Sequence, residues 1–144
     1  CAAPEWGVCL AGCWQAYVFG YAVGLDMTRR DLQRQAKERQ QPWEMCKGAD
    51  QSAPISPLFP VAQAGHPCRG VIWLKVNGVE KQRGDLAQMI WKPAEIIANL
   101  SAYIALAPGD LIFTGTPAGV SAVTRGDVLE GGVDGLGTLN VRVV

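Results

Sequence analysis

The pattern of apolar and polar positions begins with a long apolar stretch, residues 8–25, in which Gln15 is the one clearly polar side chain. Its length would suffice for a membrane helix. Glycines interrupt it, however, and from Tyr17 onward β-branched and aromatic residues alternate as a buried strand requires. We therefore expect a strand over residues 17–25 and no membrane span. No basic region precedes the stretch, so we expect no signal peptide and a cytoplasmic protein.

A strongly polar segment follows the apolar stretch. Thr28 and Asp31 have the spacing of a capping box, in which the threonine hydroxyl accepts a backbone hydrogen bond and the acid returns one. This pattern predicts a short helix over residues 29–40. The helix has few apolar positions, so it should lie on the surface, and Pro42 would end it.

The rest of the chain predicts short strands, one further helix and irregular connections. Four prolines between residues 51 and 67 indicate an extended connection. Asn77-Gly78 is a strong hairpin signal, and Pro93 opens a helix whose apolar stripe continues to residue 106. The expected strands cover residues 71–76, 79–83, 111–114 and 138–144. Together these patterns predict a mixed α/β domain, predominantly β, with two short helices.

Composition narrows the class of protein without naming its chemistry. The 144 residues suit one domain. The 13 basic and 13 acidic side chains balance, so the chain has no net positive charge to attract nucleic acid. Five cysteines are an odd number, which does not suggest a disulfide framework. Cys9 and Cys13 form a CxxxC pair with no matching CxxC, so we expect reduced cysteines and no structural zinc.

Three polar positions stand out because each follows the end of an apolar element. Asp26 could be a turn residue or one oxygen ligand of a hard divalent cation. Lys47 could be a solvated side chain or a cation directed at a carboxylate or a developing enolate. Thr116 lies in a segment that could be a plain glycine turn or could offer hydroxyl and N–H groups to an anion. The only histidine, His66, precedes a proline and is expected to be structural.

Read together, these positions form an ordered set of motifs. The motifs are Gly20-Tyr21, Asp26-x-x-x-Arg30-Asp31-x-Gln33, Lys47-Gly48-x-Asp50, Pro54-Ile55-Ser56-Pro57 and Pro108-Gly109-Asp110-Leu-Ile-Phe-Thr-Gly115-Thr116-Pro117-x-Gly119-Val120. The set closely resembles the fumarylacetoacetate hydrolase family, and within it the small bacterial acylpyruvate or fumarylpyruvate hydrolases. The resemblance covers residues 17–144 as one catalytic domain and leaves residues 1–16 unassigned.

The resemblance implies a β-roll fold, usually homodimeric, and roles for five residues. Asp26 would be a carboxylate ligand of Mg²⁺ or Mn²⁺, with Ca²⁺ also possible. Lys47 would be the catalytic residue and contact substrate oxygens, and Thr116 would bind substrate through its hydroxyl. Arg30 and Gln33 would line the pocket as further substrate-binding residues.

The same resemblance implies groups that this sequence does not contain. The family's other two metal ligands are a Glu-x-Glu pair upstream of the aspartate, and Glu5 is the only acidic residue before Asp26. The histidine and glutamate of the family's N-terminal lid have no counterpart either. We therefore expect an N-terminally truncated catalytic portion, either a fragment of a longer enzyme or a shortened relative.

The leading functional prediction is a divalent-metal-dependent hydrolase that cleaves a carbon–carbon bond in β-diketo acids of the acylpyruvate or fumarylpyruvate type, in aromatic-compound breakdown. The metal would orient a small 2-oxo acid substrate, and Lys47 would stabilise the departing enolate. An oxaloacetate decarboxylase or a 2-oxo acid isomerase would need the same enolate. A truncated, non-catalytic family member is a further alternative, because Asp26 alone would hold a cation weakly.

Overall fold

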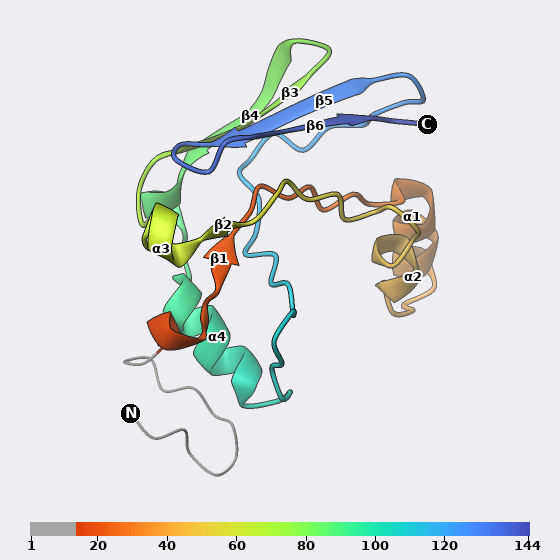
Figure 1. The fold of residues 1–144 in the computed structure, drawn as a ribbon. Coiled ribbons are helices and arrows are strands. Elements are labelled where there is room, and N and C mark those ends of the chain that lie inside the picture. Colours follow the sequence, from red (N-terminus) through yellow and green to blue (C-terminus); the bar gives the residue numbers. More distant parts are fainter. Residues whose placement is uncertain (1–13) are drawn as a thin grey trace.

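A four-stranded antiparallel sheet forms one side of the molecule in the computed structural model, which describes residues 14–144 (Figure 1). The strand order is β4-β3-β5-β6. The remaining elements lie below and beside this sheet (Figure 1). This mixed α/β arrangement of strands and short helices confirms the predicted fold class. The four strands are β3 (Val71–Val76), β4 (Val79–Asp85), β5 (Val128–Val133) and β6 (Thr138–Arg142).

The predicted hairpin joins β3 to β4. Asn77 and Gly78 have φ angles of 51° and 80°, the left-handed pair that a tight two-residue hairpin turn requires. The Asn77 side chain also donates to the Asp127 carboxylate at 2.8 Å and accepts from the Val128 N–H at 2.9 Å. The turn is therefore tied to the start of β5. The Thr124 N–H, and then the Asn77 amide, hold the pKa of Asp127 below its ordinary value.

Strand β5 was not predicted, because Gly131 and Gly132 at its centre are more typical of turns. The structure explains these glycines. Trp73 pairs with Gly132 across the ladder, and a Cβ on that glycine would lie 2.6 Å from the indole ring. The Trp73 side chain therefore covers the strand where a side chain is missing, so the glycine is required by close packing and not by a turn.

The strand predicted over residues 17–25 is much shorter than expected. The structure has a 3₁₀ turn, η1 (Trp14–Tyr17), and then a two-residue strand, β1 (Gly20–Tyr21), paired with β2 (Phe59–Pro60). The pairing is limited because the partner segment is rich in prolines, which supply no N–H to a ladder. At Gly20 the two backbones approach so closely that a Cβ would lie 2.5 Å from the Phe59 carbonyl oxygen.

The helix predicted after the apolar stretch is confirmed as α1 (Arg30–Glu38), which packs against the one-turn helix α2 (Glu44–Lys47). The predicted capping box is wrong. The helix begins after Arg29, which makes no side-chain cap, and the Asp31 carboxylate accepts two bonds from the Arg29 guanidinium at 3.1 and 2.7 Å. A bidentate, charge-assisted pair is stronger than a capping bond to a neutral backbone N–H. The Asp31 carboxylate therefore binds the Arg29 guanidinium instead of capping the helix.

Helix α4 (Pro93–Ser101) begins at the predicted proline but ends before residue 106. The N–H groups of Tyr103 and Ile104 both bond to the Leu100 carbonyl, and both side chains are exposed. Nothing therefore packs on this turn to extend the helix. Two shorter helical elements complete the described chain: α3 (Val61–Ala64) and η2 (Leu86–Gln88).

The strand predicted over residues 111–114 does not form. Among the residues that the structure describes, no strand pairs with this segment, and its N–H groups make no backbone hydrogen bond. A β-branched, apolar sequence cannot form a strand without a partner to complete the ladder. The segment instead runs as an extended connection below the sheet (Figure 1).

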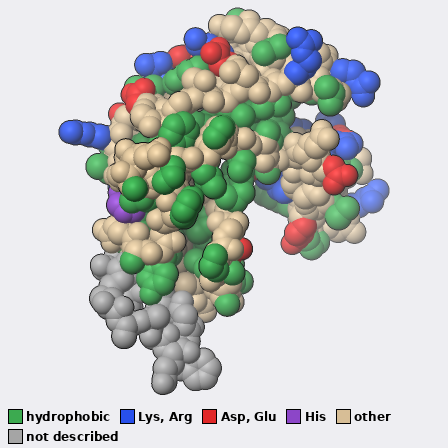
Figure 2. All heavy atoms as spheres, viewed as in Figure 1, with side chains coloured by type: hydrophobic (Ala, Val, Ile, Leu, Met, Phe, Trp, Pro, Cys, Tyr) green, Lys and Arg blue, Asp and Glu red, His purple; other side chains and the backbone are tan. Residues whose placement is uncertain are grey.

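The buried core is small and lies between the β1–β2 pair and the sheet. Val23, Val133 and Leu136 form its centre, and the Tyr21 and Phe59 rings pack against it. Figure 2 shows hydrophobic side chains gathered below the sheet, whereas Lys and Arg are spread around the periphery. In the part of the chain that the structure describes, no helix is long and apolar enough to cross a bilayer.

Candidate functional site

Asp26 is held in an extended segment, residues 23–27, that runs beside residues 52–56. The N–H groups of Leu25 and Met27, on either side of Asp26, donate to backbone carbonyls of the opposite segment at 3.0 and 2.8 Å. The Leu25 side chain packs towards the sheet, where it would contact a Cβ placed at Gly131. Neighbouring side chains in an extended chain point to opposite sides. Asp26 therefore faces away from the sheet.

Lys47 faces Asp26 from the end of α2. Its Nζ donates to Asp26 Oδ2 at 2.6 Å. The backbone beneath it is anchored, because the Lys47 carbonyl accepts the Ser52 hydroxyl at 2.7 Å and the neighbouring Cys46 is 2% exposed. The side chains themselves stay accessible, at 42% for Lys47 and 50% for Asp26. The result is an ion pair on a fixed backbone that a ligand from solvent can reach.

Arg30 and Gln33 lie in the first turn of α1 and contact each other. Arg30 Nη1 donates to Gln33 Oε1 at 2.8 Å, and both side chains are on the exposed side of the helix or at its edge. Neither residue has a hydrogen bond to Asp26 or Lys47 among those of the described chain. The structure therefore places these two predicted residues on the same α1–α2 pair as Lys47 without joining them to the ion pair.

Thr116 lies on the loop between α4 and β5. Its hydroxyl accepts a hydrogen bond from Gln82 Nε2 of β4 at 2.8 Å, and Gln82 Nε2 also donates to the Pro117 carbonyl at 2.6 Å. Pro117 packs on Gly84, where a Cβ would lie 3.2 Å from the proline ring. These contacts fix the threonine over β4, on the face of the sheet that carries Gln82.

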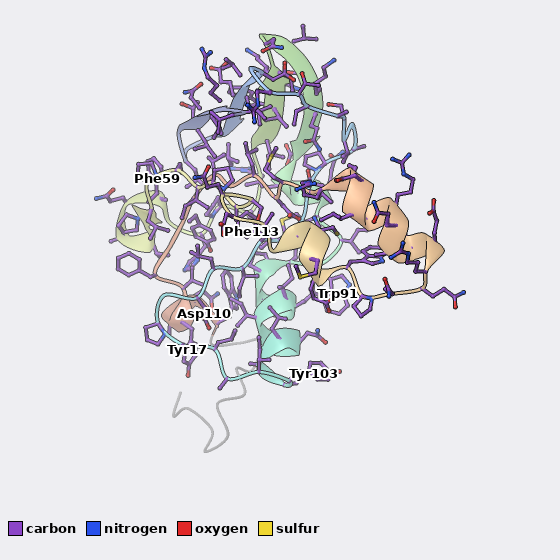
Figure 3. All side chains as sticks on the ribbon, turned by 90° about the vertical axis from the view of Figure 1, so that its right-hand side faces the viewer. Tyr17, Phe59, Trp91, Tyr103, Asp110 and Phe113 are labelled. Carbon is purple, nitrogen blue, oxygen red and sulfur yellow. The ribbon has the colours of Figure 1, made fainter. Side chains whose placement is uncertain are left out.

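The segments that carry Asp26 and Thr116 meet at a glycine. A Cβ on Gly24 would lie 2.7 Å from the Phe113 ring, so the backbone two residues before Asp26 packs directly on that ring. Figure 3 shows Phe113 on the connection that follows α4, near the middle of the molecule. The fold therefore brings together the segments of three predicted site residues: Asp26, Lys47 and Thr116.

The described residues do not fit a complete metal centre. Asp26 offers one carboxylate, and no group of three His, Cys, Asp or Glu side chains is placed to hold an ion in the described part of the chain. Hard divalent cations take about six to eight oxygen ligands, several of them usually from the protein. Asp26 is thus at most one ligand, and its carboxylate is already paired with Lys47.

An open groove lies apart from the predicted site residues. It has a volume of about 400 Å³, and neither Asp26, Lys47 nor Thr116 lines it. Its walls come from the end of α4 and the connection after it, and the lining side chains are apolar except for the Asp110 carboxylate. The lining residues are Leu100, Ile104, Leu106, Asp110, Leu111, Ile112 and Phe113.

His66 and the cysteines behave as structural side chains where the structure describes them. His66 Nδ1 lies 2.7 Å from the Tyr21 hydroxyl, and its ring contacts Trp14 edge-on. Burial raises the pKa of Tyr21. Cys46 is buried and Cys68 exposed, both as free thiols. The CxxxC pair predicted not to bind zinc, residues 9 and 13, lies outside the described residues.

Sequence reasoning missed Gln82, the residue that holds Thr116. A polar side chain in a strand next to charged neighbours reads as solvent-exposed, yet Gln82 is 9% exposed. The signal lies in the strand register, which only the structure shows. Pairing Leu74 with Gln82 and Lys75 with Glu80 leaves Lys81 as a β-bulge, and bulges commonly redirect a side chain towards a functional site.

This fold and this set of residues define a family. Residues 14–144 match the model of the fumarylacetoacetate (FAA) hydrolase C-terminal domain, and the chain belongs to that family. Among curated proteins it is 45% identical to a fumarylpyruvate hydrolase of Ralstonia sp over 126 residues, which are 88% of this chain and 65% of that protein. It is 42% identical to the mitochondrial oxaloacetate tautomerase FAHD1 of Rattus norvegicus, over 88% of this chain and 58% of that protein.

A solved structure is also similar to this chain. The fumarylpyruvate hydrolase of Pseudomonas aeruginosa, crystallised in complex with Mn²⁺ and pyruvate, is 54% identical with a TM-score of 0.90. The match covers 93% of this chain and 57% of that one. The chain therefore spans less than two thirds of the length of each of these relatives.

Proposed function

We propose that this chain is the substrate-binding part of a hydrolase that cleaves the carbon–carbon bond of β-diketo acids of the acylpyruvate or fumarylpyruvate type. The observation that carries the proposal is the 2.6 Å contact between Lys47 and Asp26, on a backbone that packs against the Thr116 loop. The 45% identity to a fumarylpyruvate hydrolase supports the choice of substrate class. A cytoplasmic role in aromatic-compound breakdown belongs to the same proposal.

The chain's own residues would bind the substrate and stabilise the leaving enolate. Water adds its oxygen to the acyl carbon, the bond between that carbon and the pyruvate methylene breaks, and the electron pair stays on pyruvate as an enolate. The enolate carbon then takes a proton. The Lys47 ammonium would neutralise the enolate oxygen, since a fixed cation stabilises charge that develops in the transition state. Thr116 would bind the 2-oxo acid, with Arg30 and Gln33 as further contacts.

Asp26 is proposed as one ligand of a divalent cation, Mg²⁺ or Mn²⁺, with Ca²⁺ as a third possibility. The Mn²⁺ in the Pseudomonas aeruginosa structure supports this assignment. Because Asp26 is bonded to Lys47, a cation that binds there would release the ammonium group. The released ammonium could then reach a substrate oxygen. Lys47 would therefore hold the Asp26 carboxylate when the cation is absent and the substrate when the cation is bound.

The test follows the loss of ultraviolet absorbance of the acetylpyruvate enol with Mg²⁺ or Mn²⁺ present. For this chain joined to the metal ligands and lid residues that the resemblance implies, we expect metal-dependent turnover that is lost in Asp26→Ala. We expect a fall of about 100-fold or more in Lys47→Ala, the size seen when one charge-stabilising group is removed from an active site. Lys75→Ala is the matched control, because Lys75 is stacked on Trp73 in the sheet, away from Asp26. A Lys47→Ala protein as fast as the wild type would contradict the role of Lys47.

Tautomerisation or decarboxylation of oxaloacetate is a second candidate function, favoured by the 42% identity to an oxaloacetate tautomerase. These reactions pass through the same enolate, so Lys47 would have the same task. Comparing kcat/KM for oxaloacetate and acetylpyruvate separates the candidates. Faster reaction of oxaloacetate would contradict the hydrolase assignment.

A non-catalytic family member is the third candidate, because the described residues hold only one carboxylate suited to the cation. Binding of Mn²⁺ measured by water proton relaxation distinguishes it from the first two. Tight binding that is lost in Asp26→Ala would argue against a non-catalytic protein. Weak binding together with no turnover would favour it.

We also propose that the chain functions as a homodimer. Large apolar side chains are exposed at several places on the described surface, including Ile90, Tyr103 and Leu111. Exposed apolar surface commonly marks a protein interface where it forms a large patch.

A further inference from the structure

Gln82 is a polar side chain in a buried place. It lies on β4 opposite Leu74, immediately after the bulge at Lys81. Without the bulge, the strict alternation of a strand would place Gln82 on the other face of the sheet. The bulge therefore turns the Gln82 amide towards the loop that carries Thr116.

The partners of Gln82 settle which way its amide points. A proline carbonyl can only accept a hydrogen bond, so the atom 2.6 Å from the Pro117 carbonyl oxygen must be the NH₂ group. The second N–H of the same nitrogen is then directed at Thr116 Oγ1, 2.8 Å away. Thr116 is thus the acceptor in this pair. Its own hydroxyl proton is left to point at another group.

The Gln82 amide is also the main polar anchor of this loop. Within the described chain, residues 111–123 make no backbone–backbone hydrogen bonds, and the two bonds from Gln82 are the ones that tie this stretch to the sheet. The loop lies very close to β4, since a Cβ on Gly119 would clash with the Lys81 carbonyl oxygen. Gln82 thus holds Thr116 in place and directs the hydroxyl proton away from Gln82.

We propose that Gln82 is a positioning residue that makes the Thr116 hydroxyl a dedicated hydrogen-bond donor for an anionic oxygen, such as the carboxylate of a 2-oxo acid. This inference rests on the proposed function, in which Thr116 binds substrate. A threonine hydroxyl can ordinarily donate or accept. With one of its two acceptor lone pairs engaged by a buried amide, the hydroxyl favours ligand atoms that accept over ligand groups that donate.

The test measures binding of pyruvate by calorimetry in the presence of Mn²⁺, on the full chain. Gln82→Glu keeps the size of the side chain but removes both donors, so the carboxylate would accept the hydroxyl proton of Thr116. We expect pyruvate binding to weaken about tenfold, the usual effect of losing a hydrogen bond to a charged group. Thr116→Val should weaken binding to a similar extent. The double variant should bind no more weakly than Thr116→Val alone, because both changes remove one interaction.

The outcomes separate this inference from the proposed function. If Thr116→Val weakens pyruvate binding and Gln82→Glu does not, Gln82 has no positioning role and the inference is wrong. If Thr116→Val has no effect, Thr116 does not bind substrate, and the substrate assignment fails together with the inference. Lys75→Ala should bind pyruvate like the wild type.

A measurement on the unmutated chain guards against variants that do not fold. The two Gln82 side-chain N–H protons should exchange slowly with solvent in nuclear magnetic resonance spectra, because both are bonded. Adding pyruvate should shift these signals together with the Thr116 methyl signal. Rapid exchange of both protons would contradict the geometry on which the inference depends.

Discussion

Two ion pairs lie near the α1–α2 pair, one within a single segment and one between two elements. Arg29 and Asp31 are two residues apart and form a bidentate pair next to the helix N-terminus. Lys47 and Asp26 come from different elements and are joined by one short contact. Exposed pairs contribute little to stability. Their value here is geometric, because each fixes the direction of a charged side chain.

The Arg29–Asp31 pair makes the first residue-scale prediction. The hydrogen bond from the Arg29 guanidinium is the main cause that lowers the pKa of Asp31 to about 2. Removing the guanidinium in Arg29→Gln should raise that pKa towards the ordinary aspartate value of about 3.9. The measurement is a carbon-13 titration of the Asp31 carboxyl group. Arg39→Gln, at the far end of α1, should leave the midpoint unchanged.

The sign of the linked stability effect follows from this shift. A carboxyl whose pKa is lowered by folding stabilises the protein above its unfolded pKa and loses that contribution as the pH falls through its folded pKa. For Asp31 the contribution is complete above about pH 4 and is lost towards pH 2. Since the pair is exposed, we expect a small change in unfolding free energy. An unchanged Asp31 midpoint in Arg29→Gln would show that the pair does not form in solution.

At the scale of elements, the loop between α4 and β5 is held by close approach to β4. Gly119 has a φ angle of 101°, and a Cβ there would overlap the Lys81 carbonyl oxygen. We expect Gly119→Ala to combine about 1–3 kcal/mol of backbone strain with a steric clash that lifts the loop from the strand. Urea unfolding measures the loss of stability.

A matched glycine isolates the steric part of this prediction. Gly109 has nearly the same φ, 100°, but nothing lies within 4 Å of its Cβ position. Gly109→Ala should therefore cost only the strain. Equal losses of stability in Gly109→Ala and Gly119→Ala would contradict the close approach of the loop to Lys81.

Elements with a local cause were predictable from the sequence, and elements that depend on distant partners were not. Asn77-Gly78 sets its own turn, so the hairpin was found, and Pro93 marked the start of α4. Strand β5 was missed because its glycines are explained only by Trp73 on the neighbouring strand. The segment at residues 111–114 has the composition of a strand, but a strand also needs a partner.

In the candidate site, too, some residues were predictable from the sequence and others were not. The motif pattern selected Asp26, Lys47 and Thr116, and the structure brings their segments together, although their roles stay predictions. Gln82 could not be selected, because its importance depends on a bulge and on a loop more than 30 residues further along the chain. A family resemblance points to residues that contact the ligand. The residues that hold those residues in place are found only from the packing in the structure.

At the scale of the whole described chain, many large apolar side chains are exposed. Ile90 is 93% exposed, Tyr103 81% and Met45 79%. Apolar side chains also line the groove at the end of α4. Because burial of apolar surface drives association, these exposed side chains favour a second protein surface against them.

The last prediction concerns the mass of the chain in solution. Sedimentation equilibrium should give twice the 15.4 kDa of one chain at high protein concentration, with dissociation on dilution. The formal net charge is zero and the exposed patches are apolar, so the dimer should persist at 1 M salt. An association based on surface charges would weaken there, because the Debye length falls to about 3 Å. A monomer at every concentration and salt would contradict the proposed homodimer, and the exposed apolar side chains would then need a different partner to cover them.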